Sequence, residues 1–172
     1  MGFGAPHADF FLNPGKRELN YPEMKPLHSK ELDEFPNMFK AAKVKDHLLY
    51  YPYQSYDYIV HAMEQAARDP DVKSIKITQY RVAKDSKIVN ALIKAAHRGK
   101  DVTAFVEIKA RFDEEINIKS AEDMQKAGVK VLYSLPGIKV HAKIALITRK
   151  EETGLKNYAY LSTGNLNEKT AG

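Results

Sequence analysis

The sequence predicts an α/β protein with a mainly parallel sheet, helices on both faces of that sheet, and an antiparallel strand pair at its end. From about residue 46, short apolar or alternating runs typical of strands take turns with amphipathic runs typical of helices. The last two strand-like runs are separated only by a polar stretch, which favours an antiparallel pair. The 172 residues are 44% hydrophobic, enough to build a sizeable core.

Residues 1–45 differ from this pattern, because they hold five of the eight prolines and show poor periodicity. We expect them to form an extended arm or linker from an upstream domain, ahead of a catalytic domain over residues 46–172. The aromatic side chains of Phe10, Tyr21 and Phe35 favour an arm that packs on other parts of the protein over a disordered tail.

Each expected element after residue 46 has a local signal. The elements, in order, are a strand over 47–51, a helix over 55–68, a strand over 74–80, a helix over 85–99, a strand over 102–108, a helix over 113–128, a strand over 129–133, and two strands over 139–147 and 157–162. Ser55 can cap the first helix, and Asp85 or Ser86 the second, because their side-chain oxygens accept from free backbone N–H groups. Gly99 provides the kind of residue that commonly ends a helix.

The charge balance points to an anionic partner. Lysine and arginine total 27 against 22 aspartates and glutamates, a net charge of +5 at pH 7. This modest excess favours nucleic acid, phosphate or an acidic surface without choosing among them. The absence of cysteine excludes disulfides and thiolate metal sites. With no apolar run long enough to span a membrane and no signal-peptide pattern, we expect a soluble, cytoplasmic protein, with membrane association of the full-length form as the alternative.

His141 and Lys143 are the strongest candidates for chemistry. Alternation along a strand puts both side chains on one face, roughly 7 Å apart. The alternate residues are apolar and are expected to form the buried face: Val140, Ala142, Ile144 and Leu146. A buried cation is costly unless an anion compensates it. Alternation alone also allows a strand end at which both side chains reach water.

The end of the following strand favours a functional interpretation. Gly164 lets the backbone approach a ligand closely, and the Asn165 amide can donate to an oxyanion. Paired as a hairpin, the two strands can bring Asn165 near His141 and Lys143. An imidazole, an ammonium and an amide together suit phosphoryl or phosphodiester transfer.

Longer motifs carry a resemblance to a known family. His141-Ala-Lys143 followed by Gly164-Asn165 resembles the His–Lys–Asn signature of the phospholipase D superfamily. Four longer segments resemble, in the same order, bacterial polyphosphate kinase of the histidine-phosphorylating type: Ile77–Ala83, Val106–Glu115, Tyr133–Lys143 and Ser162–Ala171. The likeness covers nearly the whole chain and implies a phospholipase D-like fold.

The resemblance implies reversible transfer of the terminal phosphoryl group of ATP to a histidine and then to a growing polyphosphate chain. His141 matches the phosphorylated histidine, Lys143 would bind the transferring group, and Asn165 would donate to one of its oxygens. Arg81 and Arg111, each following a predicted strand, match residues near a magnesium–phosphate site. We expect them to clamp phosphate beside Mg²⁺, because that ion prefers oxygen ligands; its direct ligands stay unassigned.

Thr148 departs from the phospholipase D pattern, which has an aspartate five residues after the lysine. The departure counts against a phosphodiesterase half-site, which stays one alternative to the kinase. The other alternative is a non-catalytic module that binds polyanions, with no pattern for specific nucleic-acid binding.

The resemblance also implies a larger assembly. The chain would be the first of two phospholipase D-like domains that share a site, and would be inactive or nearly so by itself. The partners implied are ATP or ADP, inorganic polyphosphate and the remaining domains of a full-length protein that is a homo-oligomer.

Overall fold

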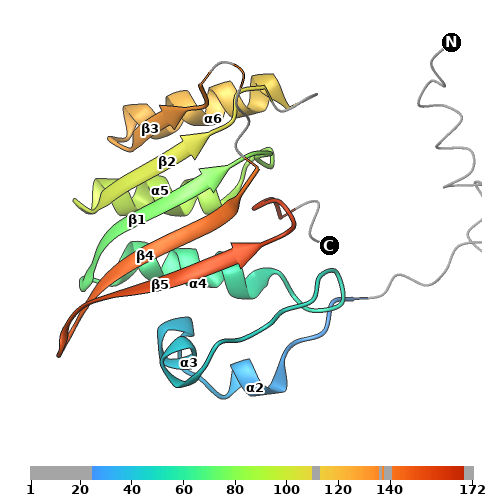
Figure 1. The fold of residues 1–172 in the computed structure, drawn as a ribbon, viewed down its shortest axis with the longest axis vertical. Helices are drawn as coiled ribbons and strands as arrows, with labels where there is room; N and C mark the ends of the chain where they lie inside the picture. The colour runs from blue at the N-terminus through green and yellow to red at the C-terminus, as the bar shows by residue number, and fades with distance from the viewer. Residues whose placement is uncertain (1–24, 110–112, 136, 138–140, 169–172) are drawn as a thin grey trace, which may run out of the picture.

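A five-stranded sheet organises residues 25–109, 113–135, 137 and 141–168, which the computed structural model describes (Figure 1). Its strands, in the spatial order β3-β2-β1-β4-β5, are β3 (Lys130–Tyr133), β2 (Asp101–Val106), β1 (Val72–Gln79), β4 (Lys143–Glu151) and β5 (Gly154–Ser162). The pairs β1–β2 and β2–β3 are parallel, whereas β1–β4 and β4–β5 are antiparallel. The α/β class and the closing antiparallel pair are therefore confirmed, while only one side of the sheet is parallel.

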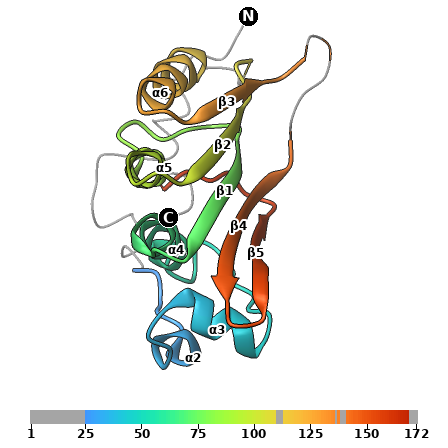
Figure 2. The same cartoon turned by 90° about the vertical axis from the view of Figure 1, so that its left-hand side faces the viewer.

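Three helices cover one face of this sheet: α4 (Asp57–Arg68), α5 (Lys87–His97) and α6 (Glu114–Lys126) (Figure 2). The expectation of helices on both faces is not met within the described residues. Successive right-handed crossovers β1–α5–β2 and β2–α6–β3 step in one direction across the sheet, so their helices fall on the same side. None of the helices in the described part of the chain is long and apolar enough to cross a membrane.

The core lies between this helical layer and the sheet. Ile75 and Ile77 of β1 and Ala104 of β2 are buried, and they belong to one cluster with Met63 of α4 and Leu92 of α5. The expected caps hold α5 in place. The Ser86 hydroxyl accepts from the Val89 N–H at 3.3 Å, and Gly99 follows the helix at a φ of 77°, a conformation that favours glycine.

The face of β4 that we expected to be buried is the wrong one. Lys143, Ala145 and Ile147 are buried, whereas Ile144 is 37% exposed. The register pairs Ile75 with Ile147, so the residues in line with Ile147 point toward the helices. Val140 lies outside the described residues.

Two strand boundaries also differ from expectation. Residues 47–51 form no strand. Conversely, β4 and β5 extend through the polar stretch expected to be a loop and pair as far as Glu151 and Gly154. A hydrogen bond from the Thr148 hydroxyl to Asn157 Oδ1, 2.8 Å long, lies on this extension, because polar cross-strand pairs also stabilise a ladder.

Residues 25–45 hold two short helices where extended chain was expected: α2 (Lys30–Asp33) and α3 (Met38–Val44). The Asn37 side chain caps α3 by accepting from the Lys40 N–H at 2.9 Å. Phe39 of α3 is buried and packs edge-on against Tyr158 of β5, with ring centroids 5.0 Å apart. The rest of the expected arm, residues 1–24, lies outside the described residues.

Candidate functional site

The sheet topology brings the predicted site residues to one edge. The β4–β5 ladder pairs Lys143 with Ser162, so the first residue of β4 lies beside the last residue of β5. His141 comes just before this pair in the chain, and Asn165 just after it. Because β1 is antiparallel to β4, the carboxyl end of β1 lies at the same edge. This is the edge at which open α/β sheets bind ligands.

Tyr80, which directly follows β1, contacts both basic candidates. Its ring meets the exposed His141 imidazole edge-on, with centroids 5.4 Å apart and planes inclined by 77°. The Lys143 Nζ atom lies 5.3 Å from the centre of the same ring. Sequence reasoning missed Tyr80 as a site residue, although it directly precedes Arg81 in one of the quoted motifs.

Lys143 is only 5% exposed, and no carboxylate of the described residues pairs with it. Burial lowers the pKa of its ammonium group. A buried cation with no protein counter-ion favours an anion that arrives from outside, because the anion would relieve the cost of burial.

Asn165 is held by the residues that follow it. Leu166 is buried in the core, and the Glu168 carboxylate accepts from the Ser86 hydroxyl at 3.0 Å and from the Ile88 N–H at 3.1 Å, at the start of α5. The Asn165 Oδ1 atom is buried and has no hydrogen-bond partner within the described part of the chain. The residues after Asn165 are thus anchored to the core and to α5, and its side-chain oxygen accepts no hydrogen bond from the described residues.

Arg81 forms an ion pair with Asp113 at 2.8 Å, which links the end of β1 to the residue just before α6. Asp113 is the N-cap residue of α6, but its side chain makes no capping hydrogen bond. Arg81 is partly exposed, and its guanidinium carbon lies 5.9 Å from the centre of the Tyr80 ring. Arg111 lies outside the described residues.

The described residues do not form a cluster of metal ligands. None of them belongs to a group of three or more His, Asp and Glu side chains that could hold an ion. The buried Glu107 carboxylate accepts from the Lys109 N–H at 3.0 Å and from the Ser134 hydroxyl at 2.9 Å. This part of the chain therefore does not fit a magnesium ion held by protein carboxylates alone.

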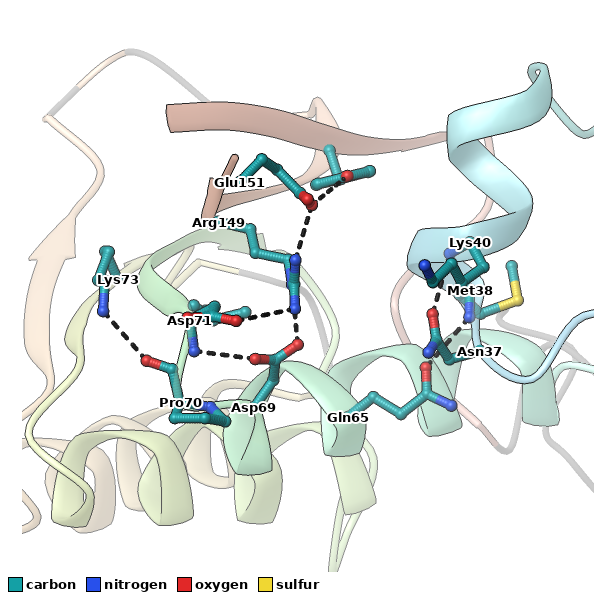
Figure 3. Close-up of polar contacts among 12 residues, drawn as sticks. Asn37, Met38, Lys40, Gln65, Asp69, Pro70, Asp71, Lys73, Arg149 and Glu151 are labelled. Atoms are coloured by element: carbon teal, nitrogen blue, oxygen red, sulfur yellow. Dashed lines mark hydrogen bonds and ion pairs between the residues drawn. The ribbon is translucent and has the colours of Figure 1, made fainter. Parts of the chain in front are cut away.

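A second cluster of charges lies in a cleft of about 400 Å³ near the other end of β4 (Figure 3). Arg149 donates to Asp69 at 2.9 Å, to Asp71 at 3.1 Å and to Glu151 at 2.8 Å. Glu151 also pairs with Lys43 of α3. The charges at the centre of this cleft are matched within the protein, so we assign it a structural role in holding α3 against the sheet.

Comparisons with known proteins agree on one family. The family model described as "Polyphosphate kinase C-terminal domain 1" matches residues 37–172. The polyphosphate kinase of Vibrio parahaemolyticus is 47% identical over 161 residues, which cover 94% of this chain and 23% of that protein. The polyphosphate kinase of Escherichia coli is 48% identical over 163 residues, 94% of this chain and 24% of that protein. The chain therefore spans about a quarter of the length of these relatives.

A solved structure shows the same fold. The crystal structure of polyphosphate kinase from Porphyromonas gingivalis superposes with a TM-score of 0.76 at 44% sequence identity. The match covers 98% of this chain and 27% of that one.

Proposed function

This chain belongs to the polyphosphate kinase family, and on that premise we propose that it is the histidine-bearing half of a phosphotransferase site that moves phosphoryl groups between ATP and inorganic polyphosphate. The observation that carries the proposal is an exposed imidazole close to a buried ammonium that pairs with no carboxylate of the described residues. His141 and Lys143 share the Tyr80 ring as a neighbour, at 5.4 Å and 5.3 Å.

His141 acts as the nucleophile in two balanced steps. An imidazole nitrogen attacks the terminal phosphorus of ATP, the N–P bond forms, and the P–O bond to ADP breaks with its electron pair leaving on ADP. A terminal oxygen of a polyphosphate chain then attacks the same phosphorus, and the N–P electron pair returns to the imidazole. The chain is longer by one phosphate, and both steps are reversible.

Lys143 and Asn165 stabilise the group in transit. The Lys143 ammonium meets the negative charge of the transferring phosphoryl group, and the Asn165 amide donates to one of its oxygens. A single donor of this kind is worth about 10²–10³-fold in kcat in other enzymes. Arg81 and Arg111 clamp phosphate oxygens through their planar guanidinium groups.

Magnesium enters this proposal bound to the phosphates. Mg²⁺ commonly keeps several waters and binds through substrate phosphates with few protein carboxylates, and it neutralises phosphate charge when bound. We assign it no ligand in this chain. The two-domain site, with residues 46–172 as its first half and an arm over 1–45, and the homo-oligomeric, cytoplasmic full-length form belong to the same proposal.

No observation favours either alternative over the kinase. The Thr148 position, which would carry an aspartate in a phosphodiesterase, holds a hydroxyl that donates to Asn157. A purely polyanion-binding module would account for the buried Lys143 but gives no role to the imidazole of His141 beside it.

The test is polyphosphate synthesis from ATP by the full-length protein. His141→Ala is expected to reduce synthesis to background, whereas His61→Ala, an exposed histidine on α4, is expected to leave it unchanged. Full activity in His141→Ala would contradict the proposal. Robust synthesis by the 172-residue chain alone would contradict its two-domain part.

A further inference from the structure

Gln79 is the last residue of β1, and its side-chain amide is buried without a hydrogen bond to any described residue. The residue is 0% exposed, and neither Nε2 nor Oε1 has a hydrogen-bond partner among the residues described. A buried amide without partners costs stability, so it is unusual in a folded core. Its neighbours along the same face of β1, Ile75 and Ile77, are apolar and belong to the core.

The register brings this amide next to Lys143. The ladder between β1 and β4 pairs Ile75 with Ile147 and Ile77 with Ala145. Two residues further, the same register sets Gln79 opposite Lys143, on the face where both are buried. The strands are still joined there, because Thr78 Oγ1 accepts from the Ile144 N–H at 3.0 Å and donates to the Ala142 carbonyl. Residues opposite each other have Cβ atoms about 5 Å apart, so two long side chains can reach one ligand atom.

We infer that Gln79 is a phosphate-binding residue, which donates from Nε2 to an oxygen of the same phosphoryl group that Lys143 meets. Within the described part of the chain, the Lys143 ammonium has no carboxylate partner and the Gln79 Nε2 donor has no acceptor, and one tetrahedral oxyanion can accept from both. The inference rests on the proposed function for the identity of the oxyanion, but its test does not require catalysis.

Stability and ligand binding separate this role from a structural one. Gln79→Met keeps the volume of the side chain and removes the unpartnered amide. In the 172-residue chain we expect its Tm to be unchanged or about 2–4 °C higher. The matched control is Gln65→Met, because the Gln65 Oε1 atom accepts from the Met38 N–H at 3.2 Å, as Figure 3 shows. Losing that hydrogen bond is expected to lower Tm.

In the full-length protein, Gln79→Met is expected to weaken the binding of tripolyphosphate at least tenfold and to lower kcat about 10²-fold. Gln79→Glu provides a second variant, because its carboxylate replaces the Nε2 donor with an acceptor and can pair with Lys143, so it should abolish tripolyphosphate binding. Gln65→Met should leave binding and kcat near those of the unmodified protein.

The inference would be overturned if tripolyphosphate binding stayed unchanged in both Gln79 variants. If Gln79→Met also lowered Tm as much as Gln65→Met does, the amide would have a structural role. A different result would show that the proposed function is wrong. If His141→Ala retains activity while the Gln79 variants lose tripolyphosphate, the nucleophile is wrong and the oxyanion site stands.

Discussion

The imidazole of His141 packs edge-on against the ring of Tyr80, with centroids 5.4 Å apart. His141 precedes β4 and is exposed, so strand pairing does not fix its side chain. Among the described residues the Tyr80 ring contacts it, and the same ring borders the Lys143 ammonium. The aromatic ring therefore lies beside both the proposed nucleophile and the cation that would bind the transferring phosphoryl group.

Replacing Tyr80 tests whether its ring positions His141. Tyr80→Phe keeps the ring and is expected to retain kcat within about twofold, whereas Tyr80→Leu is expected to lower kcat about tenfold with little change in KM, because a misplaced nucleophile slows transfer more than binding. Steady-state kinetics of the full-length protein measure both. Equal losses in the two variants would instead assign the effect to the phenol hydroxyl.

Lys143→Met should separate function from stability. The ammonium is buried and has no carboxylate partner among residues 25–109, 113–135, 137 and 141–168, so its removal is expected to leave the free energy of unfolding unchanged or higher. Phosphoryl transfer should fall about 10²-fold. Urea denaturation and kinetics measure the two effects, with Lys94→Met on the exposed surface of α5 as the control. A marked loss of stability would mean that Lys143 has a structural partner.

Variants of the ion pair between Arg81 and Asp113 test whether Arg81 binds phosphate in addition to pairing with Asp113. Arg81→Lys keeps the charge but loses the planar fork, so we expect kcat/KM for ATP to fall about tenfold. Asp113→Asn breaks the same pair and leaves Arg81 free to bind phosphate, so kcat/KM should change less than threefold. An exposed pair of this kind contributes about 0–1 kcal/mol to stability, too little to confuse the comparison. Identical losses in both variants would reduce Arg81 to a structural ion-pair partner.

The Arg149 cluster predicts a specific acid sensitivity. Lys43, the Tyr158 hydroxyl and Arg149 lower the pKa of Glu151 from 4.5 to about 2. A carboxylate with a depressed folded pKa stabilises the protein fully above its unfolded pKa and loses that contribution as the pH falls toward the folded value. Between about pH 5 and pH 2, the native chain should therefore lose more stability than Glu151→Gln. Urea titrations at several pH values measure this, and Glu152→Gln, an exposed neighbour, should follow the native curve.

Local signals predicted the elements well where one residue decides a boundary. Ser86 and Gly99 bracket α5 as expected, because a cap and a left-handed glycine act through their own backbone neighbours. Alternation correctly marked β4 as a strand with two unlike faces, but could not say which face the helices cover. That choice depends on the crossover direction and on the register with β1, which are long-range properties.

The candidate site was predictable in part for the same reason. The hairpin that sets Lys143 beside Ser162 follows from two adjacent strands. Tyr80 and Gln79 lay in a quoted motif, yet nothing local distinguished them from ordinary strand residues. Their significance comes from contacts across 60 residues or more of sequence, and from an amide left without partners only after folding.

The most direct test of the account is the identity of the phosphorylated residue. The full-length protein would be incubated with Mg-ATP, digested and mapped by peptide mass spectrometry under alkaline handling, which preserves phosphohistidine. We predict phosphate on the peptide that contains His141, and its loss when polyphosphate is added as acceptor. An active protein whose His141 peptide stays free of phosphate throughout turnover would contradict the proposed nucleophile.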